Sequence, residues 1–215
     1  MKKQYVFLLF TLLLSLICNA QNNMINGHEY VDLGLPSGLK WATCNVGANR
    51  PEDYGSYFAW GETRTKSYYN EDNSETDGYD KTNSWLQSNG YIDSRGNLTP
   101  AHDAARANWG STWRIPTKAE IDELIENTTA TWTTRNGVKG RLVTSKRNGK
   151  SIFLPAAGKY EETSVKYEGS KGSYWSSNSF GAGTGRAYHL YFSTDHFHRD
   201  WIGRNYGRSV RPVSE

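Results

Sequence analysis

Short apolar runs separated by turn residues recur along most of this chain, and this pattern predicts a fold dominated by short strands. Glycine is frequent, with 21 residues. The Asn148-Gly149 pair predicts a tight hairpin between two of the runs. Residues 29–46 predict two strands joined by a turn, and the other predicted strands are 55–60, 140–144, 151–154, 174–177, 187–192 and 209–213.

Two segments have the features of helices. The first is short, at residues 101–108. The second begins at Thr117, because Glu120 follows three residues later and completes a capping box, and it ends by Asn127. Residues 70–96, rich in Asn, Asp, Ser and Gly, predict a long surface excursion. The expected fold class is therefore α+β, with mostly short antiparallel strands, two helices and long loops.

The first twenty residues form a three-part export signal. Lys2 and Lys3 precede an apolar run at residues 6–17, and small residues follow at 18–20. The run is shorter than the roughly twenty residues that a membrane-spanning helix needs. We expect cleavage after Ala20, and the alternative is a lipid anchor at Cys18. The predicted organisation is a signal peptide at 1–20, a flexible lead-in at 21–28 and a single domain at 29–215, placed outside the cytoplasm as a secreted or cell-surface bacterial protein.

Charge and cysteine content narrow the possible partners. The formal charge is +3, and removal of Lys2 and Lys3 leaves +1, so nucleic acid is not an expected partner. Beyond the signal, Cys44 is the one cysteine, so no internal disulfide is expected and its thiol is predicted to be an inert core group. Residues 51–80 are rich in acids and predict a solvated surface.

No known arrangement of catalytic residues occurs in the sequence. There is no G-x-S-x-G elbow, and the glycine run at 181–185 precedes a predicted strand, which indicates a turn rather than a phosphate loop. The acids at 72–84 lack calcium-loop spacing. His196 and His198 have the spacing of one strand face, but two ligands are a weak metal signal. We therefore predict no enzyme activity, metal or cofactor; His28, His102 and His189 are expected to be structural or exposed.

The segment 193–207 combines Tyr, Trp, His, Asn, Arg and Asp at high density. Such a mixture supplies rigid amphipathic surfaces and adaptable hydrogen bonds, which is typical of recognition surfaces. Tyr174, Trp175, Tyr188, Leu190 and Phe192 are expected to be mostly core. The predicted ligand contacts are Asp195, His196, His198, Arg199, Asp200, Trp201, Arg204, Asn205 and Tyr206.

Six ordered motifs resemble those of the Fibrobacter succinogenes major paralogous domain. They are YVDLGLPSGLKWATCNVGA from Tyr30, DYGSYFAWGE from Asp53, DAARANWGSTWRIPTKAE from Asp103, FLPAAG from Phe153, YWSS from Tyr174 and SVRPV from Ser209. That family is more distantly similar to formylglycine-generating enzymes and retroelement variable proteins. The resemblance implies a C-type-lectin-like fold with its ligand surface on loops near the C-terminus, and no established activity. Active-site cysteines after Cys44 and the calcium-lectin sugar motifs are absent.

These features favour an exported, non-catalytic module that recognises an extracellular glycan or protein through its C-terminal aromatic and polar loops. A retroelement-diversified receptor is one variant of this hypothesis. The first alternative is a structural or tip subunit of a surface adhesin or pilus. The second alternative is a metal-dependent enzyme, which the absence of a paired nucleophile and base disfavours.

Overall fold

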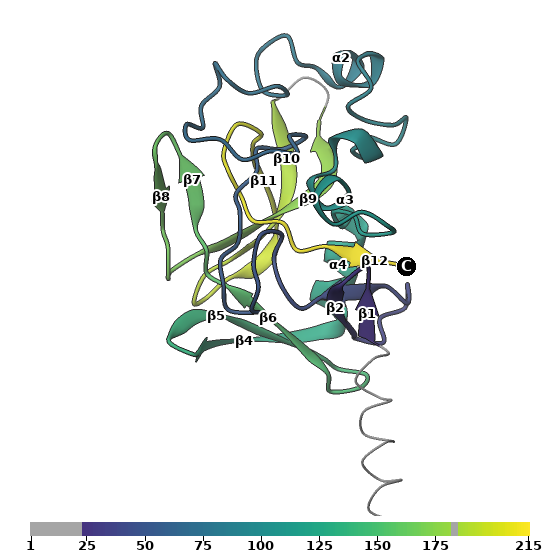
Figure 1. The fold of residues 1–215 in the computed structure, drawn as a ribbon, viewed down its shortest axis with the longest axis vertical. Coiled ribbons are helices and arrows are strands. Elements are labelled where there is room, and N and C mark those ends of the chain that lie inside the picture. Colours follow the sequence, from purple (N-terminus) through teal and green to yellow (C-terminus); the bar gives the residue numbers. More distant parts are fainter. Residues whose placement is uncertain (1–22, 182–184) are drawn as a thin grey trace, which may run out of the picture.

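The computed structural model describes residues 23–181 and 185–215, and it has an α+β architecture with mostly antiparallel strands (Figure 1). The predicted signal at 1–20, with Cys18, lies outside the described residues, as do residues 21–22 and the centre of the 181–185 turn. Among the described residues, no helix combines the length and apolar character needed to cross a membrane.

The first sheet joins the two ends of the described chain. It contains β1 (Met24–Ile25), β2 (His28–Asp32), β3 (Lys40–Ala42) and β12 (Val213–Ser214), in the order β1-β2-β3-β12 (Figure 1). The prediction of a flexible lead-in is wrong for residues 24–28. Met24 pairs with Glu29, and the Trp113 indole donates a 2.9 Å hydrogen bond to the Ile25 carbonyl, so this segment is fixed to the body.

The second sheet is a meander of β4 (Thr128–Arg135), β5 (Val138–Ser145) and β6 (Ser151–Pro155). The hairpin predicted at Asn148-Gly149 is confirmed, since it connects β5 to β6. A second hairpin joins β4 to β5 through Asn136 and Gly137, which have positive φ angles of 47° and 82°. Two successive positive φ angles match the twist of the flanking strands.

The third sheet carries the C-terminal polar and aromatic segment. Its strands are β9 (Gly172–Phe180), β10 (Arg186–Phe192) and β11 (Phe197–Gly203), in the order β11-β10-β9. The prediction that residues 193–207 are loops is therefore wrong for 197–203. A short hairpin, β7 (Lys159–Glu161) and β8 (Ser164–Lys166), stands beside this sheet (Figure 1).

The helices are short, and three α-helices occur among the described residues. They are α2 (Asn83–Ser88), α3 (Ala104–Trp109) and α4 (Lys118–Asn127), with a 3-10 turn η2 (Pro100–His102) before α3. The predicted capping box is confirmed, because Thr117 accepts from the Glu120 amide and Glu120 accepts from the Thr117 amide. Helix α2 lies inside the predicted surface excursion and fixes it through the fully buried Leu86.

Two of the predicted strands are mostly irregular backbone. In the segment 55–60, Phe58 forms only an isolated bridge with Arg208. The segment 209–213 contributes only Val213 to β12, and its residue Ser209 forms a bridge with Tyr174 of β9. Arg208 therefore lies between the irregular segment and the edge of β9, which places its side chain near the third sheet.

Two hydrophobic cores lie on opposite sides of the third sheet. Trp175 and Ile202 pack in one, together with Trp60 and Trp113. Leu190 and Phe192 pack in the other, which also contains residues of α4 and of the second sheet. Because neighbouring residues of a strand point to opposite faces, both faces of this sheet are partly occupied by core.

Candidate functional site

The alternation of β11 separates the predicted ligand contacts onto two faces. His198 and Asp200 pair with Tyr191 and His189 of β10, so these four side chains share one face. Arg199 and Trp201 occupy the other face of the same strand. The predicted residues therefore do not form one continuous contact surface.

The Trp201 face carries an exposed ladder of stacked side chains. Trp201 is 40 % exposed and stacks on Phe180 with ring centroids 5.0 Å apart. The Arg186 guanidinium lies 4.2 Å from the Trp201 ring. Farther along, Arg199 donates to Asp122 of α4 at 2.7 Å and lies over the Tyr188 ring, so Arg199 fastens the helix to the sheet.

Arg204 is a correction to the predicted contact set. Its side chain is fully buried, with 0 % exposure, and donates to the carbonyls of Arg186, Thr76 and Lys81 and to Asn83 Oδ1. These partners come from β10 and from the excursion that contains α2. Arg204 therefore holds the excursion against the sheet, and no surface remains on it for a ligand.

The other predicted contacts lie at the two ends of β11. Asp195 and His196 are exposed in the turn before it, whose carbonyls accept hydrogen bonds from Arg141. Asn205 and Tyr206 are partly buried after it, and the Asn205 amide donates to Asp77. No group of three or more His, Cys, Asp or Glu side chains in the described part of the chain is arranged to hold a metal ion.

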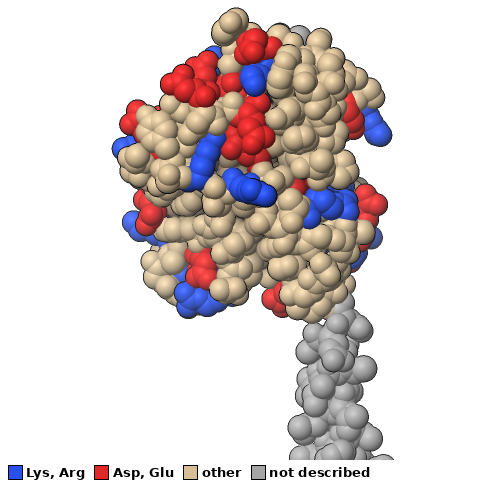
Figure 2. Space-filling model, turned by 45° about the horizontal axis from the view of Figure 1, so that its top comes forward, with Lys and Arg blue, Asp and Glu red and all other residues tan. Residues whose placement is uncertain are grey.

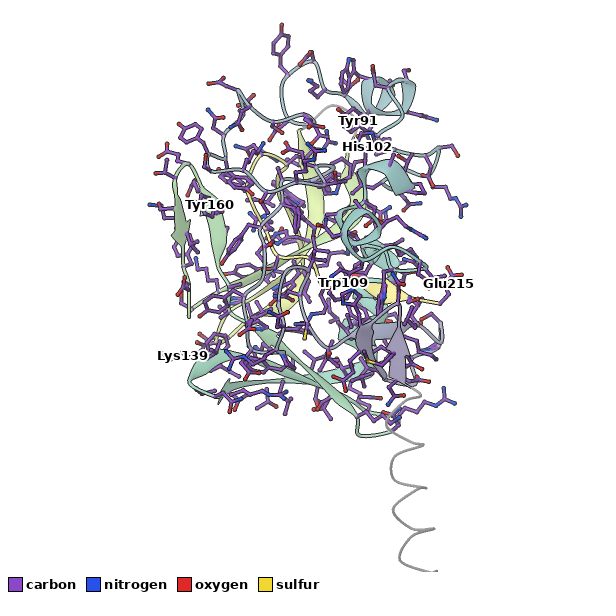
Figure 3. All side chains as sticks on the ribbon, in the orientation of Figure 1. Tyr91, His102, Trp109, Lys139, Tyr160 and Glu215 are labelled. Carbon is purple, nitrogen blue, oxygen red and sulfur yellow. The ribbon has the colours of Figure 1, made fainter. Side chains whose placement is uncertain are left out.

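A pocket of about 190 Å³ opens between the β7–β8 hairpin and the face of the third sheet that carries Asp200. The hairpin is fixed in place because Tyr160 of β7 exchanges backbone hydrogen bonds with Gly207 (Figure 3). Of the predicted contacts, only Asp200 lines the pocket. The lining residues are Gly158, Lys159, Tyr167, Lys171, Ser173, His189, Tyr191, Asp200, Ile202 and Arg208.

Arg208 at the pocket differs from Arg204 and Arg211, which are also buried. Arg211 donates four hydrogen bonds, one to Asn45 Oδ1 and three to backbone carbonyls. Arg204 likewise donates to one asparagine side chain and to three carbonyls. Arg208 is only 3 % exposed, yet its one side-chain hydrogen bond among the described residues goes to Ser173 Oγ, and its buried Nε has no partner there. Its guanidinium lies 5.1 Å from the Trp175 ring and 5.6 Å from the Tyr206 ring. Arg208 therefore keeps unused donors at the pocket.

Ser173 and His189 continue this polar cluster. Ser173 Oγ lies 2.7 Å from His189 Nδ1. Burial, reinforced by the charges of Arg208 and His198, holds the pKa of His189 well below its usual value. The imidazole is therefore neutral at pH 7. It shares a hydrogen bond with the Ser173 hydroxyl, which also accepts from Arg208. Burial also lowers the pKa of Arg208 to about 9, so Arg208 is still charged at neutral pH.

The lowered pKa of His189 predicts a loss of stability in acid. The unfolded chain takes up a proton on this histidine below about pH 6.5, whereas the folded chain resists it, so stability is complete above that pH and falls as the pH decreases. We expect His189→Gln to show a smaller decrease in the free energy of unfolding between pH 7 and pH 5. The difference should be up to about 1.4 kcal/mol per pH unit. Urea unfolding at the two pH values measures it.

His28 offers a matched control for this experiment. Burial also lowers its pKa, but His28 is a partly exposed residue that stacks on Trp109 at 3.8 Å and does not line the pocket. His28→Gln should reduce the acid-dependent loss less than His189→Gln does. An unchanged pH dependence in His189→Gln would show that His189 is not held neutral.

A second hollow, of about 300 Å³, is less suited to a ligand. It lies among Gly61, Glu62, Thr63, Arg64, Glu75, Ala101 and His102. Its carboxylates are already engaged, because Glu62 pairs with Lys66 at 2.8 Å and Glu75 accepts from Tyr91. Acidic side chains also gather toward the top of the view in Figure 2. The pocket at Arg208 is therefore the candidate site.

We compared the chain with protein-family models, curated proteins and solved structures and found no match in any of the three.

Sequence reasoning missed most of the pocket. Ser173, Lys171 and Lys159 gave no signal, and Arg208, which directly precedes the terminal SVRPV motif, was not among the predicted contacts. One signal was present, since the alternation of residues 186–192 places His189 and Tyr191 on one face of a strand.

Proposed function

We propose that this protein is an exported, non-catalytic binding module that recognises an extracellular ligand through the pocket between the β7–β8 hairpin and the third sheet. The observation that carries the proposal is the buried guanidinium of Arg208, which donates to Ser173 and has no other hydrogen-bond partner among the described residues. A buried charged donor that lacks an acceptor lowers the stability of the folded protein. A ligand that supplies the acceptor removes this cost, so the unpaired donors favour ligand binding.

The sequence supports the wider setting of this proposal. The export signal at 1–20 argues for a secreted or cell-surface location in a bacterium, with a lipid anchor at Cys18 as the alternative to cleavage after Ala20. The six motifs argue for the Fibrobacter succinogenes major paralogous domain and its C-type-lectin-like fold. In that fold the ligand surface would belong to C-terminal segments, in agreement with the position of the pocket.

Ser173 and His189 have the spacing of a nucleophile and its base, but their surroundings favour binding. The lowered pKa of His189 makes it a weak base, and no carboxylate among the described residues forms a hydrogen bond that orients its ring. Ser173 is 4 % exposed and already accepts from Arg208. A catalytic serine needs a base whose pKa lies near the working pH.

An array of glycans and cell-surface proteins, probed with the purified full-length protein, tests the proposed function. We expect at least one ligand whose binding is lost in Tyr191→Ala, because Tyr191 lines the pocket. The control is Tyr79→Ala, since Tyr79 is 95 % exposed and outside the pocket. Retention of every hit by Tyr191→Ala, or turnover of an ester substrate that Ser173→Ala abolishes, would contradict the proposal.

The Trp201 ladder favours a second candidate function, that of a subunit in a surface adhesin or pilus. Trp and Arg are enriched at protein interfaces. Here the Arg186 guanidinium stacks on the Trp201 ring, and both residues are exposed to solvent. Because this ladder lies on the sheet face opposite the pocket, Trp201→Ala should leave ligand binding unchanged. The second candidate predicts that the same variant loses stable partners in a cell-surface pull-down.

A further inference from the structure

The pocket at Arg208 has a distinctive charge pattern. Three cationic side chains line it, those of Lys159, Lys171 and Arg208, against one carboxylate, that of Asp200. Lys159 is paired with Glu161 at 3.1 Å. Lys171 and Arg208 take part in none of the ion pairs found among the described residues. The pocket therefore has unpaired positive charge inside and at its rim.

From this pattern we propose that the ligand of the pocket is a sugar that carries a carboxylate, such as a uronic acid, and that Arg208 binds the carboxylate. This inference rests on the proposed function and names the class of its ligand. A guanidinium presents parallel N–H donors that match the two oxygens of a carboxylate. Ser173 holds the guanidinium through Nη1, and the guanidinium has no other side-chain hydrogen-bond partner among the described residues.

Asp200 favours a carboxylate over a phosphate monoester. It lies in the pocket lining and is nearly half exposed, with its Oδ2 4.0 Å from His198 Nε2. A carboxylate at this position accepts hydrogen bonds from sugar hydroxyls, and it repels a doubly charged phosphate more than a singly charged carboxylate. Lys171, which also lines the pocket, attracts the anion from solvent.

The walls and the volume of the pocket fit a sugar ring. Tyr191 and Tyr167 line it, and the Tyr167 side chain is 53 % exposed. Aromatic rings present an electron-rich face to the C–H groups of a sugar. Lys171 lies 4.0 Å from the Tyr167 ring, which places a cation next to this wall. The volume of about 190 Å³ admits one monosaccharide unit rather than a long segment of chain.

The test is an array of uronic-acid and sialic-acid oligosaccharides, each printed beside its carboxyl-reduced counterpart and beside sulfated and neutral glycans. The full-length protein is compared with two variants. Arg208→Lys keeps the positive charge but lacks the parallel N–H donors of the guanidinium, and Lys171→Gln removes a charge from the pocket lining. Lys150→Gln is the control, because Lys150 is exposed in the β5–β6 hairpin and outside the pocket. Thermal unfolding confirms that each variant is folded.

We expect binding to at least one carboxylated oligosaccharide, no binding to its reduced counterpart, and an affinity lower by about tenfold or more in both pocket variants. Equal binding of reduced and carboxylated forms, or a preference for sulfated glycans, would overturn the carboxylate inference but leave the binding function intact. Binding of no carboxylated glycan would also overturn it, and the absence of every glycan and protein ligand would overturn the proposed function as well.

Discussion

Replacing Arg204 by methionine is expected to lower the free energy of unfolding by roughly 3 kcal/mol or more. The side chain is fully buried and donates to three carbonyls and to Asn83, so its loss leaves several buried acceptors without partners. Each unsatisfied buried acceptor costs about 1–3 kcal/mol. Urea unfolding measures the loss, and hydrogen exchange should increase most in residues 70–96, which Arg204 holds against the sheet.

Arg95→Met is the matched control for this prediction. Arg95 is exposed in the same excursion, and its side chain makes no hydrogen bond among the described residues. We expect this variant to remain within about 0.5 kcal/mol of the wild type. A comparable loss in both variants, or little loss in Arg204→Met, would show that Arg204 does not anchor the excursion.

Replacing Gly172 by alanine is expected to destabilise the protein by about 2 kcal/mol or more. Gly172 pairs with Phe192 across β9 and β10, and a Cβ placed on it would lie 2.0 Å from Phe192 Cζ. The Phe192 ring is fully buried beside Tyr174, with ring centroids 5.8 Å apart, and so has little freedom to move. Overpacking of a filled core typically costs 1–3 kcal/mol. Thermal and urea unfolding measure the change.

A double-mutant cycle separates this clash from other effects of the substitution. Phe192→Leu alone is expected to destabilise the protein because core packing is lost. In the double variant, however, it also removes the ring with which the methyl group of the introduced alanine would clash. The double variant Gly172→Ala with Phe192→Leu should therefore be more stable than the sum of the two single effects predicts, by more than about 0.5 kcal/mol. Strict additivity would mean that the Phe192 ring does not explain the need for glycine.

Local signals in the sequence predicted the local structure well. The Thr117 and Glu120 pair and the Asn148-Gly149 pair act over a few residues, and the structure confirms both. Helix α2 was missed because its six residues lie in a polar stretch and only Leu86 anchors it. The strand β11 was missed because its exposed positions are polar or aromatic, and its pairing partners, such as Tyr191 for His198, lie elsewhere in the sequence.

The candidate site depended on information that no local pattern contains. Arginine usually indicates a surface, yet Arg204, Arg208 and Arg211 are all buried, and only the distribution of their partners distinguishes them. Backbone carbonyls satisfy most donors of Arg204 and Arg211, and these carbonyls belong both to strands, such as β6 at Phe153, and to irregular segments, such as Thr76. The pocket gathers Ser173, Asp200 and Arg208 from separate elements, so it exists only after the third sheet has formed.

The most direct test of the account follows side-chain NMR signals during titration with the tightest-binding ligand from the arrays. If the pocket between the β7–β8 hairpin and the third sheet is the binding site, the Arg208 Nε–H and His189 ring signals will shift in proportion to occupancy, and the Trp201 indole signal will not. Saturable shifts at Trp201 with unchanged Arg208 and His189 signals would contradict the account.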